Sequence, residues 1–172
     1  METVSTTAGT AEVREYAGFW LRFVAYIIDY VILQLLSSFI IIPILGALGF
    51  GFFAATEGMQ AGDIGEEEAL AMMVTLFSTL SSAALLTFIL QILYFAILQS
   101  GSRQATLGKM ALGLKVTDMN GEKIDFGKAV IRELSKLISY AILLIGYIMA
   151  GFTEKKQALH DIIPGTLVVK AK

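Results

Sequence analysis

Two long apolar stretches constrain this chain more than any other feature of its sequence. Apart from Arg22, Asp29 and Gln34, residues 19–42 are almost all apolar, aromatic or small, and residues 69–98 form a second stretch. A membrane-spanning helix needs about 20 predominantly apolar residues. The composition agrees, because 56% of the residues are hydrophobic and 16% charged, against about 45–50% and 25% in soluble domains. We therefore predict an all-α membrane protein.

A third apolar segment, residues 137–152, is short for a span and contains Gly146 and Gly151. Together with the two longer stretches it predicts about three transmembrane helical segments. Pro43 should break the first of them, because proline cannot donate a main-chain hydrogen bond, and residues 44–55 would then form a kinked extension or an interfacial loop. We assign residues 1–17 to a disordered tail and residues 18–170 to a single membrane domain.

The segment between the second and third stretches, residues 99–136, carries seven basic residues. Asn120-Gly121, a strong hairpin signal, predicts a short β-hairpin within residues 114–126. Residues 125–136 have the pattern of an amphipathic surface helix. Its basic residues repeat every four positions, and we expect these to contact anionic lipid: Lys128, Arg132 and Lys136.

The distribution of basic residues predicts an orientation, because lysine and arginine accumulate in cytoplasmic loops. The loop at residues 56–68 has none, so it should lie outside, with the N-terminus and residues 99–136 inside. A complete third crossing would put the C-terminal tail outside, although its lysines favour the inside. We favour a cytoplasmic tail with residues 137–152 bent or re-entrant, and a plain third span is the alternative.

Several functional classes are excluded by what the chain lacks. There are no cysteines and a single histidine, His160, which excludes thiolate and multi-histidine metal sites. A net charge of −2 gives no general attraction to nucleic acid. Gly108-Lys109 lacks the remaining residues of a phosphate-binding loop, and no pairing of nucleophile and base is apparent. We expect neither enzymatic activity nor a cofactor.

Asp29 and Arg22 are the charged residues of the first span. Asp29 would lie roughly 15 Å into the hydrocarbon core, so it either binds an ion, proton or substrate or is a satisfied packing carboxylate. Arg22 lies on the same helical face. It is either an interfacial anchor or the partner of a carboxylate elsewhere in the fold.

Asp161 is the candidate for that carboxylate, although on its own it could be an ordinary loop residue. A guanidinium has five donors, so we expect Arg22 to bond both Asp161 and Asp29. Gln91 and His160 are secondary polar candidates, with Gln91 interpreted mainly as a contact between helices.

Three segments resemble motifs of the RDD family of prokaryotic membrane proteins. Residues 19–29 (FWLRFVAYIID) resemble its opening motif, residues 106–116 (TLGKMALGLKV) its central motif, and Leu159-His160-Asp161 with Gly165-Thr166 its closing motif. Pro164 departs from that pattern, where a small residue is expected. The resemblance implies a multi-pass protein of the cytoplasmic membrane and maps the arginine and aspartates that give the family its name onto Arg22, Asp29 and Asp161.

Two functions compete. The first is a small transporter or an exchanger of cations or protons, a role suggested for some members of the family that the chain resembles. One chain has few helices to enclose a pathway, so this function implies a homo-oligomer. The second is a membrane accessory or assembly protein that does not transport and binds lipid or a partner through its basic loop.

Overall fold

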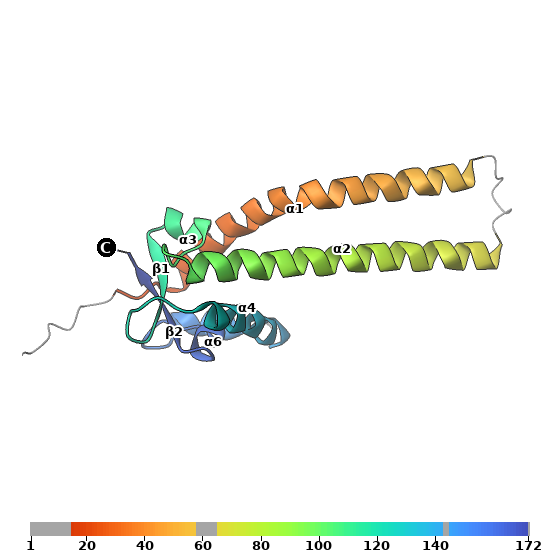
Figure 1. The fold of residues 1–172 in the computed structure, drawn as a ribbon. Coiled ribbons are helices and arrows are strands. Elements are labelled where there is room, and N and C mark those ends of the chain that lie inside the picture. Colours follow the sequence, from red (N-terminus) through yellow and green to blue (C-terminus); the bar gives the residue numbers. More distant parts are fainter. Residues whose placement is uncertain (1–14, 58–64, 143–144, 172) are drawn as a thin grey trace, which may run out of the picture.

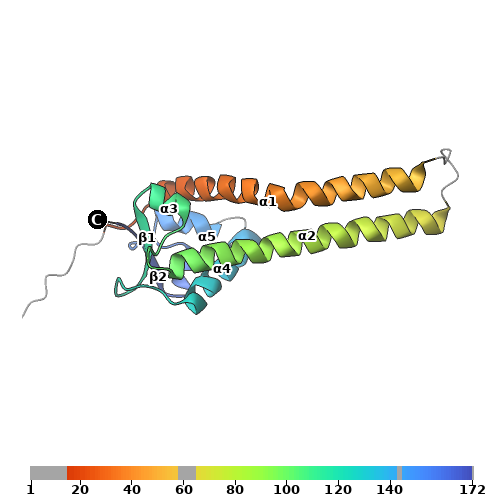
Figure 2. The same ribbon diagram turned by 45° about the horizontal axis from the view of Figure 1, so that its top comes forward.

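The computed structural model describes residues 15–57, 65–142 and 145–171. Most of the predicted N-terminal tail and of the acidic first loop therefore lies outside the described residues. Two long helices, α1 (Phe19–Thr56) and α2 (Glu66–Ser100), extend side by side from a small group of shorter elements, which we call the base (Figures 1 and 2). Both helices are long and apolar enough to cross a membrane, so the two predicted spans are confirmed.

The helix α1 continues through Pro43, where the sequence predicted a break. Proline removes one main-chain hydrogen bond, a loss that transmembrane helices tolerate. The 38 residues of α1 extend about 57 Å at ~1.5 Å per residue, well beyond a hydrocarbon core of about 30 Å. Residues 44–55 are therefore part of the helix and do not form an interfacial loop.

The base contains all the remaining elements and surrounds one end of the α1–α2 pair (Figure 1). In chain order they are α3 (Leu107–Ala111), β1 (Leu114–Asp118), α4 (Phe126–Ala141), α5 (Ile145–Ile148), the 3₁₀ helix η1 (Met149–Gly151), α6 (Leu159–Ile162) and β2 (Thr166–Lys170). The helix α4 packs against α2, and α3 packs against α1. The base thus joins the two long helices where the chain enters α1 and leaves α2.

A two-stranded antiparallel sheet is present, but its strands are far apart in sequence. β1 pairs with the C-terminal β2, with Val116 opposite Val168. The predicted turn at Asn120-Gly121 forms, since the Asp118 amide donates to the Glu122 carbonyl at 2.9 Å. The chain then enters α4 instead of pairing back on β1.

The folded part of the chain begins earlier than we predicted. Tyr16 forms a β-bridge with Val169, and the Ala17 amide donates to the Val168 carbonyl at 2.9 Å. Ala17 is fully buried. Residues 16 and 17, which we assigned to the tail, therefore belong to the base.

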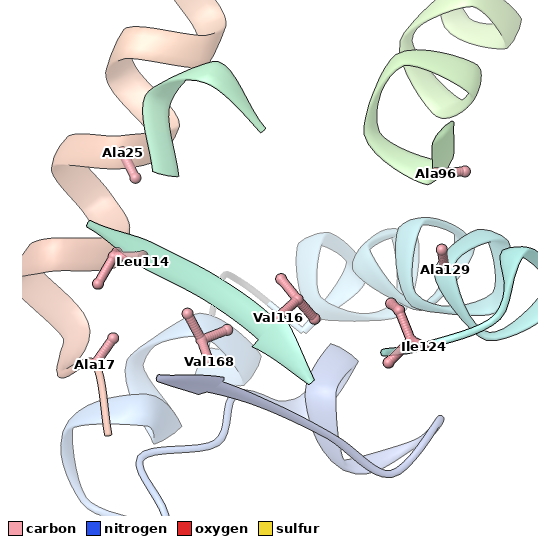
Figure 3. Packing of buried hydrophobic residues seen from close by; sticks show 8 residues of the cluster. All are labelled: Ala17, Ala25, Ala96, Leu114, Val116, Ile124, Ala129 and Val168. Carbon is pink, nitrogen blue, oxygen red and sulfur yellow. The ribbon is translucent and has the colours of Figure 1, made fainter. Parts of the chain in front are cut away.

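The apolar core of the base is small and uses short side chains. Figure 3 shows the cluster of Ala17, Ala25, Ala96, Leu114, Val116, Ile124, Ala129 and Val168. Its members come from α1, α2, α4, both strands and the segments just before α1 and α4, so they join the beginning, middle and end of the chain. Small residues allow helix backbones to approach closely, which is how membrane helices pack.

The helix α4 directs its polar residues inward and its apolar residues outward. Asp125 caps its first turn by accepting from the Lys128 amide at 2.8 Å. Arg132, Glu133, Ser135 and Ser139 are buried, whereas Ile131, Leu134, Leu137 and Ile138 are exposed. The amphipathic helix is confirmed, but Arg132 is only 2% exposed and does not contact lipid as we predicted. Lys136 is mostly buried too, and Lys128 alone remains a predicted lipid contact.

The third apolar segment is bent. The helices Phe126–Ala141 and Ile145–Gly151 are inclined by 118°, and a Cβ at Gly146 would lie 2.9 Å from the Ser139 Cβ. Only glycine permits this close approach of α5 to α4. The chain then returns to β2, so the C-terminal strand and β1 lie at the same end of the long helices (Figure 1).

This arrangement predicts which positions share a side of the membrane. Because the chain has no cysteine, single cysteines at Lys123, Lys155 and Glu57 can be labelled without background. An impermeant thiol reagent should label Lys123→Cys and Lys155→Cys from one side and Glu57→Cys from the other. Labelling of Lys155→Cys together with Glu57→Cys would contradict the bent third segment.

Candidate functional site

Asp161 on α6 lies at the centre of a buried ion cluster. Its Oδ1 accepts from Arg132 Nε at 2.9 Å and from Arg132 Nη2 at 2.5 Å. Its Oδ2 accepts from Arg22 Nη1 and from the Ala158 amide, the latter at 3.1 Å. Asp161 has no exposed surface. One carboxylate therefore connects an arginine of α1 with an arginine of α4.

The cluster extends along α2 and α4. Gln99 Oε1 accepts from Arg132 Nη1, and Gln99 Nε2 donates to Glu133 Oε1 at 2.9 Å. Glu133 Oε2 in turn pairs with Lys136 Nζ at 2.5 Å. The same Lys136 Nζ lies 4.0 Å from the centre of the Phe95 ring. The buried polar face of α4 thus has partners on α2, α6 and within α4 itself.

Asp29 is bound separately, by neutral donors. Its Oδ1 accepts from the Gly108 amide at 2.7 Å and from the Tyr94 hydroxyl at 3.0 Å, and its Oδ2 accepts from the Thr106 hydroxyl at 2.5 Å. In the described part of the chain, no ion pair joins Asp29 to Arg22, whose other hydrogen bond goes to the Ala17 carbonyl. The prediction that Arg22 bonds both aspartates was wrong.

The close fit of α3 against α1 explains Thr106 and Gly108 in the TLGK sequence at residues 106–109. A Cβ at Gly108 would lie 2.9 Å from Asp29 Cγ and would clash with the Ala25 carbonyl oxygen. Glycine is required for the Gly108 amide to reach the carboxylate, and Thr106 provides the second donor. Three hydrogen bonds to a buried carboxylate are charge-assisted and stabilise its charge. Asp29 therefore fixes α3 on α1.

A cavity of about 360 Å³ lies between the two clusters. Four basic side chains line it, from α1, α3 and α4: Arg22, Lys109, Arg132 and Lys136. Asp29 and His160 also line it, as do aromatic residues that include Phe19, Phe23, Tyr26, Phe95, Tyr140 and Tyr147. With Lys109 protonated and Asp29, Asp161 and Glu133 ionised, these four cations are set against three carboxylates in and next to the cavity. The charged cavity would then have an excess of one positive charge.

The surroundings act differently on the titratable groups of the base. Burial lowers the pKa of Lys109 well below its usual value, and the neighbouring Arg132 and Lys136 lower it further. Burial likewise lowers the pKa of His160, so the imidazole is neutral at pH 7. The pKa of Asp161 is well below its usual value, because Arg132 and Arg22 outweigh the effect of burial.

Three buried polar atoms on residues that line this cavity lack a hydrogen-bond partner among the described residues. They are the Tyr147 hydroxyl, Arg22 Nη2 and His160 Nδ1, and the Arg22 and His160 side chains are only 12% and 8% exposed. A buried polar group without a partner is costly, so most such groups in proteins are satisfied. Arg22 Nη2 can only donate, so the cavity wall favours a ligand with a hydrogen-bond acceptor at that point.

The two secondary polar candidates, His160 and Gln91, differ in their relation to the cavity. His160 belongs to the cavity, whereas no hydrogen bond joins the half-buried Gln91 to the described cluster. Sequence reasoning missed Tyr94, Thr106 and Lys109. Within the described residues, no group of three or more His, Cys, Asp or Glu side chains could hold a metal ion.

The Asp161 cluster predicts unequal effects of its members on stability. Asp161→Asn leaves two buried arginines without their carboxylate, a loss of about 3–5 kcal/mol. Arg22→Met should cost less, because Asp161 keeps Arg132, and the double variant should lose less than the sum of the two. Unfolding of the detergent-solubilised protein measures these losses, with the exposed Glu154→Gln as the control. An additive double variant would contradict the direct pair.

The contact of Gly108 with α1 predicts a severe effect of one methyl group. Gly108→Ala should destabilise the protein strongly, because the Cβ overlaps the backbone of α1 and displaces the Asp29 carboxylate. Gly46→Ala is the matched control, since nothing lies within 4 Å of its Cβ position and alanine favours helix by about 0.5–1 kcal/mol. Thermal unfolding of both variants tests this, and equal midpoints would contradict the α3–α1 contact.

Comparison with known proteins agrees with these motifs. The model of the RDD family matches residues 16–165. The chain is 39% identical over 153 residues to the uncharacterized protein YxaI of Bacillus subtilis, covering 89% of this chain and 96% of YxaI. It is 31% identical to the uncharacterized membrane protein YteJ of the same organism, over 91% of this chain and 82% of YteJ. No solved structure matches the chain. The chain is a member of the RDD family of membrane proteins.

Proposed function

We propose that this membrane protein binds an anion in the cavity of its base. The carrying observation is that four basic side chains, together with the unpartnered Arg22 Nη2 and His160 Nδ1, line one cavity. Buried arginine and lysine donors bind carboxylate and phosphate oxygens by charge-assisted hydrogen bonds. An anion would also balance the excess positive charge.

The protonation of Lys109 should depend on whether an anion occupies the cavity. Burial and neighbouring cations both disfavour its protonated form, and an anion in the cavity opposes the second of these causes. Asp161 and Glu133 are less suited to bind a further cation, because arginine and lysine already occupy their oxygens. The proposal therefore develops the expected accessory role in which the protein binds lipid or a partner.

Exchange of cations or protons has less support from this geometry. It would depend on Asp29, whose two oxygens already accept three hydrogen bonds from neutral donors. A cation would have to displace the Thr106 hydroxyl or the Gly108 amide, and with them the contact of α3 with α1. Transport remains a prediction that flux measurements can decide.

The side of the membrane and the assembly also remain proposals. All the basic residues of the chain lie within residues 14–22 and 103–172, which favours a cytoplasmic base and N-terminus. In the most apolar stretch of α1, no residue is buried. A homo-oligomer would cover part of that surface, and lipid could cover the rest.

Binding can be measured on the purified protein in a neutral detergent. Inorganic phosphate or dodecyl phosphate should raise the unfolding midpoint, and Lys109→Met should weaken the apparent affinity about tenfold or more, the effect of losing one charged hydrogen bond. Lys109→Arg should retain binding, and Lys128→Met, outside the cavity lining, should not change it. If neither inorganic phosphate nor dodecyl phosphate raised the unfolding midpoint, the proposal would be overturned.

The same preparation in liposomes decides between binding and exchange. We expect no proton movement when a sodium gradient is imposed, and so no difference between the protein and Asp29→Asn. A sodium-driven proton flux that Asp29→Asn abolishes would make exchange the function.

A further inference from the structure

The cavity has a charged inner end and an apolar outer edge. Arg132 and His160 are buried, whereas three of the apolar and aromatic wall residues are exposed: Phe23, Tyr140 and Ile148. They come from α1, α4 and α5, so the edge is built by separate elements that meet there. A site for a free hydrated anion needs no such edge. The edge suits a ligand that is apolar at one end.

The surface around this edge is also apolar. On α4, Ile131, Leu134, Leu137 and Ile138 are exposed, and beyond the bend Ile145 and Phe152 continue the surface. Such side chains would be unfavourable in water over so large an area and are ordinary against lipid. The outer edge of the cavity therefore lies on the lipid-facing side of the base.

The position of Trp20 indicates the depth of the cavity. Trp20 is 73% exposed and contacts the cavity residues Phe19 and Phe23 edge to face, with ring centres 5.4 and 6.1 Å apart. Exposed tryptophan is enriched where the hydrocarbon core meets the lipid headgroups. Arg22 lies two residues beyond Trp20, or about 3 Å along the helix axis. The basic end of the cavity is therefore at headgroup depth.

We propose that the anion is the headgroup of a bilayer amphiphile, with a compact phosphate monoester or carboxylate at the basic end and an apolar chain at the outer edge. This inference rests on the proposed function and narrows its ligand class. The headgroup would accept from Arg22 Nη2 and Lys109 Nζ, while the chain would contact Phe23, Tyr140 and Ile148. The ligand would enter sideways from the membrane, past exposed residues that already face lipid.

Three probes separate the head from the chain. Dodecyl phosphate has both, inorganic phosphate has only the anion, and dodecylphosphocholine has the same chain with a zwitterionic head. We expect dodecyl phosphate to raise the unfolding midpoint at concentrations at least tenfold lower than inorganic phosphate, and dodecylphosphocholine to have no such effect.

The other outcomes are decisive in different ways. Equal stabilisation by inorganic and dodecyl phosphate would overturn the amphiphile and leave the anion site in place. Both proposals would be overturned if dodecylphosphocholine stabilised the protein as strongly as dodecyl phosphate does, or if none of the three probes stabilised it.

A pair of variants tests the place of the chain independently of the headgroup. Phe23→Ala should weaken the apparent affinity for dodecyl phosphate several-fold without changing that for inorganic phosphate. Phe39→Ala is the matched control, because Phe39 is on the same helix, is 78% exposed and does not line the cavity. A Phe23→Ala protein that binds dodecyl phosphate as tightly as Phe39→Ala does would contradict the proposed position of the chain.

Discussion

The base depends on one buried carboxylate that serves two guanidiniums. Asp161 bonds Arg22 and Arg132, which connects the start of α1, the middle of α4 and the short α6 near the end of the chain. Removing three charges from water is unfavourable unless hydrogen bonds replace the lost hydration. Gln99 and Glu133 provide such bonds for Arg132 and Lys136. The bend after α4 follows from the same constraint, because Asp161 can reach Arg22 only if the C-terminal segment returns to the base.

The helix α4 has polar residues inside and apolar residues outside, the reverse of a helix on the surface of a soluble domain. Between helices in lipid, apolar burial supplies little driving force, so packing and hydrogen bonds determine association. This explains a small core, mostly of alanine and valine, beside a buried set of arginine, glutamate and glutamine. It also explains why α4 exposes Leu134 and Leu137 but buries Arg132, although a helix in water would do the opposite.

The sequence predicted the two long helices because their apolar stretches exceed the length of a span, and it brought together Arg22 and Asp161 because charges near membrane depth need partners. It did not predict the strand pairing, because the Asn120-Gly121 signal is local and β2 is about fifty residues further along the chain. Arg132 was assigned to lipid because the every-four spacing of the basic residues fits a solvated face and a buried one equally well. The sequence signal that could have distinguished a buried basic face from a solvated one is the set of large apolar residues on the opposite face of the helix: Ile131, Leu134 and Ile138.

Asp29 and Asp161 differ in their partners, and the difference explains how both contribute to one cavity. Asp161 has two cationic partners and joins α1 to α4. Asp29 has three neutral donors, two of them on the segment that begins α3, so it fixes α3 against α1 without forming an ion pair among the described residues. Fixing α3 places Lys109, the next residue after Gly108, on the cavity wall, where no carboxylate forms an ion pair with it among the described residues. Had Asp29 paired with Arg22, as the sequence suggested, the net charge would be the same, but Asp29 would compete with a ligand for the Arg22 guanidinium. The neutral donors at Asp29 therefore leave Arg22 Nη2 without a partner among the described residues, on a side chain that lines the cavity.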